Sequence, residues 1–488
     1  MVSVLDVYRW QFGLTAVCHF LVVPITIGLA FLVAGYETAW LRTGNRYWRR
    51  LAMFYGKLLL IGYAVGVLTG IVQEFQFGLD WSPYEGVVSD IFGAPLAIQA
   101  LAAFFVVATL LGLWYFGRDH LPGGLHVACA WLAAIAMSLS AYFITAVNSW
   151  LQYPVGYREN PVTHRAEIAS FWDVFTNPVQ LGTFPHTLAG CFLVAGGLVT
   201  GIAMWHLVRR DGRSAEAGAW RLAVKTGALT TLAAAMLTMV TGDVQGKLMT
   251  RYQPMKMAAA EALYHTAQPA PFSLLTIGTL DGKRPLFEIT LPRLLSFLAT
   301  GDFSAQVRGI DNLQAQYSQL YGPGSYTPVI PVSYWSFRLM IATGLLAALV
   351  TLVALWSLRG GRMPADWAGW HRTLLRWSTL GLPFLPLAAS SLGWIFTEMG
   401  RQPFVVVPNP TGVDGVFMYT AQAVSPGVSA GQVLTSLIAL TALYGVLAVV
   451  EVFLLVRYAR AGVAGVMPPP PDDGDEKKTD DDVLAFAY

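Results

Sequence analysis

Two histidines, one methionine and one glutamate are the candidate iron ligands of this sequence. His19, His186 and Met340 lie inside apolar segments, and Glu398 ends another, in the stretch GWIFTEMGRQPF. Imidazole and thioether groups bind haem iron, and a carboxylate at the edge of a membrane helix is costly unless it is paired or coordinates something. Each residue also has an ordinary alternative. A membrane histidine is more often a structural hydrogen-bonding residue, a methionine more often fills a packing gap, and Glu398 has Arg401 nearby as an ion-pair partner.

The composition places these residues in a membrane protein. Of the 488 residues, 55% are hydrophobic and 12% are charged, and the mean hydropathy is +0.52. The net charge of +2 gives no reason to expect a nucleic-acid partner. Cys18, Cys129 and Cys191 fall inside apolar runs, which indicates small buried side chains rather than a disulfide framework. Asp6 and Arg9 precede a full-length apolar run, so we expect no cleavable signal peptide.

Apolar length predicts an all-α, polytopic membrane bundle of about nine spanning helices. The predicted spans are residues 13–40, 51–73, 93–117, 124–151, 179–207, 217–241, 332–357, 371–399 and 430–457. Four regions follow from them. They are helices one to six, the haem-ligand half (1–245), a long outer loop (246–331), helices seven to nine (332–460) and a disordered acidic tail (461–488).

Arginine-rich connections predict the orientation of the bundle. Positive charge collects in the odd-numbered connections and after the last span, at Arg42, Arg46, Arg49, Arg50, Arg209, Arg210, Arg213, Arg359, Arg362, Arg457 and Arg460. The second connection, 74–90, has no Lys or Arg. We therefore expect the N-terminus and the long loop outside and the C-terminus in the cytoplasm. In this topology His19, His186, Met340 and Glu398 all lie within about 10–15 Å of the outer face, which suits a haem-binding helix bundle.

Three further charged residues are candidates for function. Lys256 and Glu261 lie in QPMKMAAAEALYH within the long outer loop. Such a pair can hydrogen-bond a polar headgroup at the membrane surface, and the alternative is a solvated loop helix. Glu451 lies inside the ninth predicted span, before Arg457. It is interpreted either as a snorkelling, structurally paired side chain or as a proton carrier.

Several stretches together resemble subunit I of the cytochrome bd quinol oxidases, over nearly the whole chain before the tail. They are GRQP preceded by Glu398, QPMKMAAAEA, the Pro-His pair at His186, FRLM ending at Met340, EFQFGLDWS, DIFGAPLAI and SLSAYFITAVNSWLQYPVG. GRQP in this setting is a specific signal.

The resemblance implies three haems. His186 and Met340 are the implied axial ligands of the low-spin haem b558, where two filled axial positions suit electron transfer. His19 and Glu398 are the implied single protein ligands of haems b595 and d, in either order.

The resemblance also implies roles around the haems and for quinol. Arg338 and Arg401 are placed to neutralise haem propionates, and Trp394 to pack between haems. Lys256 and Glu261 match the quinol-binding loop, the Q-loop, which is of the shorter type here.

The implied activity is that of a terminal oxidase in the bacterial cell membrane. Quinol is oxidised at the outer face, O2 is reduced to water with protons from the cytoplasm, and charge is separated without pumping. Subunit I works with a haem-free subunit II, sometimes with a small accessory peptide.

The sequence departs from this family at a few positions. Relatives carry acidic residues on helix three where this chain has Gln99 and Val107, which puts the helix-three proton route in doubt, although Ser140 is retained. Phe404 replaces the usual Trp after GRQP, a change expected to alter packing only.

Two other classes of protein compete with the oxidase. A secondary transporter predicts inverted repeats and broken helices with polar residues at the midplane. A quinone-linked b-type cytochrome that does not reduce oxygen explains His186 and Met340 but leaves His19 and Glu398 without a role.

Overall fold

The computed structural model describes residues 4–163, 165–209, 216–362, 364, 367, 369–409 and 416–465. Within these ranges nine helices are long and apolar enough to cross a membrane. The prediction of an all-α bundle with about nine spans is therefore confirmed. The acidic stretch of the predicted tail, together with Arg210 and Arg213, lies outside the described residues.

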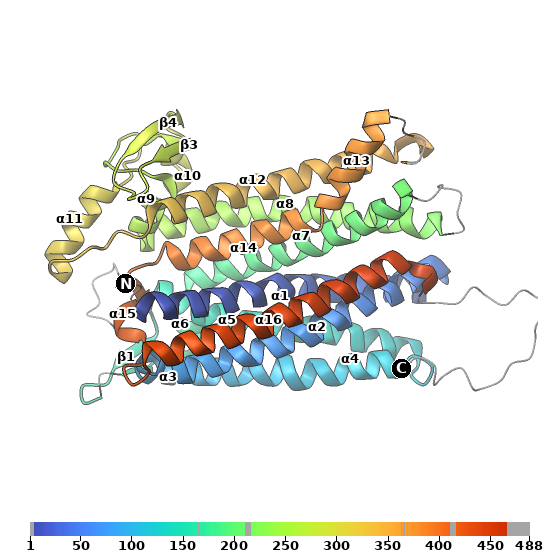
Figure 1. The fold of residues 1–488 in the computed structure, drawn as a ribbon, viewed down its shortest axis with the longest axis horizontal. Helices are drawn as coiled ribbons and strands as arrows, with labels where there is room; N and C mark the ends of the chain where they lie inside the picture. Colours follow the sequence, from blue (N-terminus) through green and yellow to red (C-terminus); the bar gives the residue numbers. More distant parts are fainter. Residues whose placement is uncertain are drawn as a thin grey trace, which may run out of the picture.

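The spans form an elongated bundle of roughly parallel and antiparallel helices (Figure 1). They are α1 (Val4–Thr43), α2 (Arg46–Asp80), α3 (Ser82–Ala100) continuing through η1 (Leu101–Val106) into α4 (Val107–Phe116), α5 (Gly123–Gln152), α7 (Pro178–Arg209), α8 (Ala217–Tyr252), α12 (Ile330–Ser357), α13 (Gly369–Gly381) with α14 (Phe384–Met399), and α16 (Ala430–Ala461).

Several helices extend beyond their predicted ends. The predicted second connection, 74–90, is mostly helical, because α2 continues to Asp80 and α3 begins at Ser82. Apolar length measures only the part of a helix that lies in hydrocarbon, whereas intrahelical hydrogen bonds continue through polar residues beyond it.

Two spans are irregular where a continuous helix was predicted. The third contains a π-helical turn, Leu101–Val106. The eighth, predicted as one helix over 371–399, is broken between α13 and α14 at Pro383, which has no N–H to continue the ladder. Non-helical backbone at membrane depth is tolerated where the surrounding protein covers it.

α1 lies at the centre of the bundle and contacts α2, α5, α7, α14 and α16. Small residues permit the close approach: a Cβ at Gly28 of α1 would lie 2.3 Å from the Cys191 carbonyl oxygen of α7. Close packing of this kind holds membrane helices together, because lipid supplies no hydrophobic force between them. The core around α1 is correspondingly apolar.

The long loop folds at one end of the bundle (Figure 1). It contains α9 (Pro254–Glu261), the antiparallel hairpin of β3 (Phe272–Gly278) and β4 (Pro285–Leu291), α10 (Leu294–Thr300) and α11 (Ile310–Tyr321). None of these pieces is long enough to span, as predicted, although the hairpin itself was not predicted.

Smaller elements complete the described chain. They are the hairpin β1 (Tyr157–Glu159) with β2 (Ala166–Ile168), α6 (Phe171–Phe175), η2 (Arg359–Gly361), the hairpin β5 (Phe404–Val406) with β6 (Met418–Tyr419), α15 (Thr420–Ala423) and η4 (Val463–Gly465).

The helices that carry the candidate ligands share one end of the bundle. α1, α7 and α12 begin, and α14 ends, at the end that carries the loop elements (Figure 1). A rise of about 1.5 Å per residue puts His186 about 12 Å and Met340 about 15 Å from the starts of their helices. His19 lies about 22 Å along α1, since that helix begins at Val4 rather than at the predicted residue 13.

Candidate functional site

Each candidate histidine is held by a threonine on the neighbouring helix. His19 Nδ1 lies 2.8 Å from Thr69 Oγ1 of α2, and His186 Nδ1 lies 3.0 Å from Thr241 Oγ1 of α8. Each threonine hydroxyl donates its single hydrogen to a carbonyl one turn back in its own helix, Val65 at 2.9 Å and Leu237 at 2.8 Å.

The threonines therefore decide the tautomer of both rings. A hydroxyl whose proton is committed can only accept, so each ring carries its proton on Nδ1 and keeps the Nε2 lone pair free. This is the arrangement of a metal-ligating histidine, whose other nitrogen donates to an orienting oxygen.

Glycines lie directly against these ligands. A Cβ at Gly70 would lie 3.3 Å from His19 Cε1, and one at Gly242 would lie 3.4 Å from His186 Cε1. A Cβ at Gly393 would lie only 2.8 Å from the Met340 sulphur. The neighbouring helices therefore have glycine at the positions next to the candidate ligands, where a porphyrin ring would need space.

The Gly393–Trp394 pair of α14 connects two of the ligand neighbourhoods. Gly393 faces Met340 of α12, and the Trp394 ring stacks on Phe20, the residue after His19, with centroids 5.0 Å apart and planes 12° apart. α14 therefore brings the surroundings of Met340 and His19 together.

Glu398 makes two polar contacts at the end of α14. Its Oε2 pairs with Arg401 Nη2, and its Oε1 accepts a hydrogen bond of 2.8 Å from Asn148 Nδ2 of α5. The predicted ion pair with Arg401 is therefore present. The glutamate side chain remains 24% exposed, so one lone pair on each oxygen stays accessible to a ligand.

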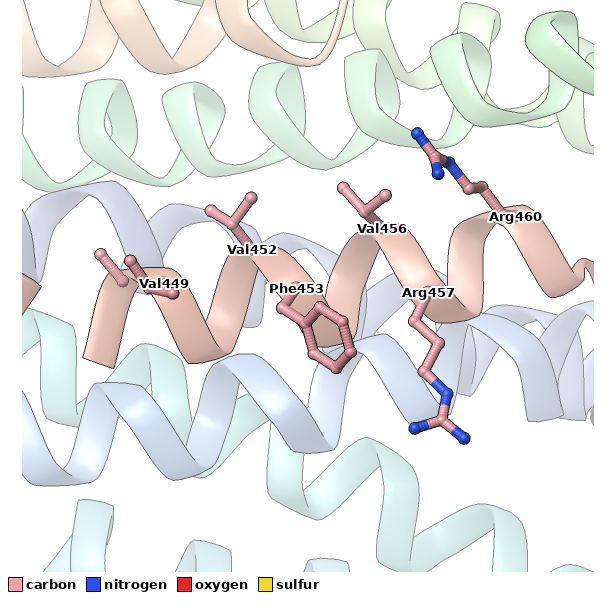
Figure 2. Close-up of a pocket in the computed structure, with 7 residues that line it drawn as sticks. Val449, Val452, Phe453, Val456, Arg457 and Arg460 are labelled. Atoms are coloured by element: carbon pink, nitrogen blue, oxygen red, sulfur yellow. The ribbon is translucent and has the colours of Figure 1, made fainter. Parts of the chain in front are cut away.

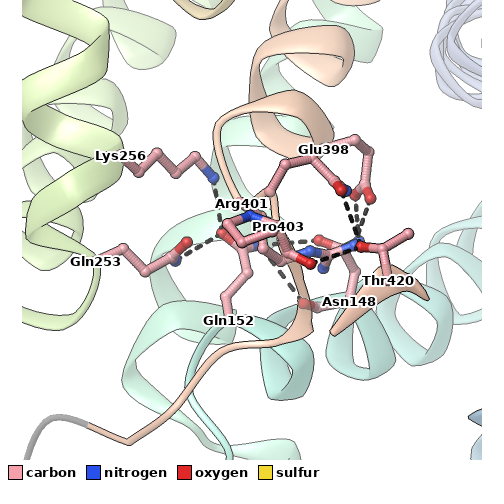
Figure 3. Close-up of polar contacts among 9 residues, drawn as sticks. Asn148, Gln152, Gln253, Lys256, Glu398, Arg401, Pro403 and Thr420 are labelled. Carbon is pink, nitrogen blue, oxygen red and sulfur yellow. Dashed lines mark hydrogen bonds and ion pairs between the residues drawn. The ribbon is translucent and has the colours of Figure 1, made fainter. Parts of the chain in front are cut away.

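A chain of amides continues from Glu398 to the loop (Figure 3). Asn148 Oδ1 accepts from Gln152 Nε2 at 2.8 Å, and Gln152 Oε1 accepts from Lys256 Nζ at 3.1 Å. Gln253 Nε2 donates to the same Gln152 oxygen at 3.0 Å. Lys256 is thus connected to Glu398 through two side chains of α5.

The second charged residue of α9 contacts a different helix. Glu261 Oε2 accepts from Arg338 Nη2 of α12 at 2.6 Å and from the Ser273 amide at 3.2 Å. The Arg338 guanidinium also lies 4.6 Å from the centre of the Phe272 ring. Because Arg338 precedes Met340 by two residues, this ion pair links the loop to the Met340 helix.

The prediction that Lys256 and Glu261 lie on a solvated loop helix, the ordinary alternative, is wrong. Each is only 4% exposed. Burial lowers the pKa of Lys256 to about 7, and nearby Arg401 acts in the same direction. Burial raises the pKa of Glu261 to about 7 against the opposing effect of Arg338. Both groups can therefore change protonation near neutral pH.

The described residues fit haem better than a bare metal ion. Among them, no three His, Cys, Asp or Glu side chains converge on one point. Single protein ligands suit iron whose equatorial positions are filled by a porphyrin. Arg338 and Arg401 each bury Nε and Nη1 without a hydrogen-bond partner among the residues that the structure describes. Such N–H groups are costly unless an acceptor such as a propionate carboxylate satisfies them.

Sequence reasoning missed the side chains that hold these groups. Asn148 and Gln152, four residues apart on α5, and the threonines Thr69 and Thr241 were not singled out. The available signal was an amide pair at helical spacing inside an apolar run, which favours an inward-facing polar stripe.

Of the positions that depart from the family pattern, Val107 and Phe404 are buried and Gln99 is partly buried. Gln99 has a buried side-chain oxygen without a partner among the described residues, and Val107 is fully buried. Ser140 is 8% exposed. Phe404 packs on Tyr326 and Tyr419, with centroids 5.9 and 5.1 Å apart.

A groove of about 750 Å³ lies on the surface of α16 (Figure 2). Its lining is Ala448, Val449, Val452, Phe453, Val456, Arg457 and Arg460. It contains none of the candidate ligands, and its apolar lining suits lipid chains or another membrane helix rather than catalysis.

The fold defines a polytopic membrane protein, and its candidate site fits redox cofactors held between the helices. Comparison with known proteins is more specific. The family model of cytochrome bd terminal oxidase subunit I matches residues 7–463, and the chain belongs to this family.

Similar proteins agree over almost the full length. Cytochrome bd ubiquinol oxidase subunit 1 of Bacillus subtilis (strain 168) is 38% identical over 461 residues, 94% of each chain. Cytochrome bd-II ubiquinol oxidase subunit 1 of Escherichia coli (strain K12) is 34% identical, covering 95% of this chain and 97% of that one. The bd oxidase structure from Geobacillus thermodenitrificans superposes with a TM-score of 0.81 at 25% identity, covering 94% of this chain and 99% of that one.

These matches decide the class of the protein. The chain is a multi-pass membrane subunit of a haem-containing terminal oxidase, and its place as subunit I implies a second subunit. The alternative of a b-type cytochrome without oxygen reduction finds no support in them.

Proposed function

We propose that this chain is the haem-bearing catalytic subunit of a quinol:oxygen oxidoreductase. His186 and Met340 hold haem b558, and His19 and Glu398 hold haems b595 and d, in either order. The observation that carries the proposal is the placement of the two histidine rings, whose Nδ1 atoms lie 2.8 and 3.0 Å from threonine hydroxyls and whose Nε2 atoms have no hydrogen-bond partner among the described residues. The haems, when bound, supply electron transfer and oxygen chemistry.

Quinol is proposed to bind at the outer loop, residues 246–331. Lys256 and Glu261 are buried there, and each has a pKa near 7. A buried carboxylate with such a pKa can accept a proton from a quinol hydroxyl, while Lys256 in its protonated form can hydrogen-bond the quinone oxygen. Glu261 transfers the accepted proton to the outer medium.

Arg338, Arg401 and Trp394 are proposed to support the haems. The two arginines have buried N–H groups without a partner in the described part of the chain, which suits propionate binding. Trp394 stacks beside His19 through Phe20 and would pack between haems.

The proposed topology separates charge without pumping. The N-terminus and the loop lie outside, the C-terminus and the tail 461–488 in the cytoplasm, and the halves 1–245 and 332–460 form the membrane domain. Quinol protons leave outside while protons for water come from the cytoplasm, and each charge that crosses is worth about 2.3 kcal/mol per 100 mV. Subunit II completes the oxidase, and a small accessory peptide is a further partner.

Difference spectra of the purified oxidase test this assignment. Met340→Leu should remove the low-spin b-type signal and leave CO binding intact, because CO binds iron with an open axial position. A complex whose low-spin signal survives Met340→Leu would exclude Met340 as a ligand. Reduced haem that does not bind CO would exclude oxygen reduction.

A further inference from the structure

Three neighbouring helices carry a column of polar side chains that the ligand assignment leaves unused. On α16 the buried residues are Val433, Tyr444 and Glu451. Most of the aliphatic side chains of α16 face outward, yet the helix buries a carboxylate. An unpaired carboxylate inside a membrane protein is costly, and such residues mark functional sites by default.

Glu451 faces the packed interior between α1 and α2. A Cβ at Gly62 of α2 would lie 4.0 Å from Glu451 Oε1 and 2.9 Å from Thr26 Cγ2 of α1. Glu451 is 8% exposed, and no hydrogen bond or ion pair to it is found within the described part of the chain. The snorkelling interpretation is therefore wrong, because the side chain points inward and lacks a cationic partner.

Polar groups continue on both sides of Glu451 at seven-residue spacing. Two turns toward the loop end, the Tyr444 hydroxyl donates to the Thr69 carbonyl at 3.0 Å, and Thr69 Oγ1 holds His19. Two turns toward the other end, Lys57 Nζ of α2 lies 4.1 Å from the centre of the Tyr458 ring. Each step is about 10 Å along the helix.

Glu451 differs from Glu37, another buried carboxylate on this side of His19 in the described part of the chain. Glu37, near the end of α1, is 1% exposed, pairs with Arg118 Nη2 at 3.5 Å and lies 3.8 Å from His126 Nδ1. A cation beside a carboxylate favours its charged form and opposes the effect of burial. An unpaired buried carboxyl is free to alternate between its acid and its carboxylate.

We propose that Glu451 is the internal proton carrier that feeds oxygen reduction, through water molecules between α1, α2 and α16. The inference rests on the proposed function, with oxygen reduced on the His19 side. Oxidation of two quinols releases four electrons and four protons, and one O2 takes up four electrons and four protons to give two waters. In each transfer the Glu451 acid releases a proton toward His19, and the carboxylate regains one from the cytoplasmic end.

This assignment gives helix three no part in the transfer. No carboxylate occurs between Asp90 and Asp119, so the part of this span that follows Asp90, including η1 and α4, carries no side chain of this kind. The column on α16 reaches from the arginine-bearing end of that helix, where Figure 2 shows Arg457 and Arg460, to the level of His19.

The test uses the complete oxidase with Glu451→Gln, Glu451→Asp and, as a control, Glu85→Gln, which removes a carboxylate at the loop end of α3. Haem spectra should be unchanged in all three variants. Proton uptake after mixing the reduced oxidase with O2, followed by a pH indicator, should slow about tenfold or more in Glu451→Gln. It should recover largely in Glu451→Asp and stay normal in Glu85→Gln. The infrared band of a buried carboxylic acid should also vanish in Glu451→Gln.

Two results would overturn the proposal. One is proton uptake at the normal rate in Glu451→Gln. The other is loss of the haem spectra in both Glu451 variants, which would make the side chain a requirement of assembly. Failure of the ligand assignment is a separate result, since it appears as a CO spectrum that survives His19→Ala.

Discussion

Removing the hydroxyl of Thr241 tests whether the histidine orientation matters to the low-spin site. Thr241→Val keeps the shape of the side chain and deletes the acceptor of the His186 Nδ1 proton, which lies 3.0 Å away. A buried donor left without an acceptor costs about 1–3 kcal/mol, and loss of an outer-shell partner of a ligating histidine typically costs about 10–100-fold in affinity. We therefore expect haem b558 to be retained less tightly.

The deleted hydrogen bond should also change the electronic character of the ligand. Without an acceptor for the Nδ1 proton, His186 is a weaker base, which destabilises the oxidised iron and raises its reduction potential. For a one-electron couple, 1.4 kcal/mol corresponds to about 59 mV. A redox titration of the low-spin band, together with the haem content per protein, measures both effects.

Thr230→Val is the matched control. Thr230 lies on the same helix, and its hydroxyl donates only to the Thr226 carbonyl, at 2.9 Å. It should leave the haem content and the potential unchanged. If Thr241→Val and Thr230→Val give the same haem content and the same potential, Thr241 does not orient an iron ligand, and the argument from the free Nε2 atom fails.

Three other substitutions test separate parts of the site. Gly393→Ala should weaken the low-spin signal, because the added methyl would lie 2.8 Å from the Met340 sulphur and must push it aside; an unchanged low-spin spectrum would show that the thioether does not need this position. Glu261→Gln should flatten the pH dependence of quinol oxidation. Burial raises the Glu261 pKa to about 7, so the rate of quinol oxidation by the wild-type enzyme, with the Glu261 carboxylate as the base, should fall about tenfold per pH unit below pH 7. If the variant shows the same fall in rate below pH 7, a group other than Glu261 causes it. Asn148→Ala should alter the CO-bound spectrum while sparing the low-spin band, since it removes the 2.8 Å hydrogen bond to Glu398; a change confined to the low-spin band would contradict this.

The number of spans could be predicted from apolar length, but the ends and the irregular turns could not. In a bilayer, the backbone N–H and C=O groups of twenty consecutive apolar residues are all hydrogen-bonded within the segment only when it forms a helix. Nine such runs therefore predict nine spans. The extension of α2 to Asp80 and the start of α1 at Val4 depend on polar residues that neighbouring elements cover. The length of an apolar run does not show which polar residues the neighbouring elements will cover.

The burial of the two charged loop residues was missed for a related reason. Lys256 is buried against Gln152, 104 residues earlier, and Glu261 against Arg338, 77 residues later. Within QPMKMAAAEALYH, nothing local distinguishes a buried lysine from a solvated one. Local spacing did predict the Glu398–Arg401 pair, because two side chains three residues apart at a helix end are already close in space.

The loop helix α9 connects the proposed quinol site to both groups of candidate ligands. Lys256 and Glu261 are five residues apart, which places them about 140° apart around the helix, so they contact different spans. Lys256 leads through α5 to Glu398, and Glu261 leads to Arg338, two residues before Met340. A rigid helix cannot shift at one of these contacts without disturbing the other. A headgroup that displaces Glu261 from Arg338 must therefore also strain the Lys256 contact, so quinol bound at the proposed site would affect both groups of candidate ligands.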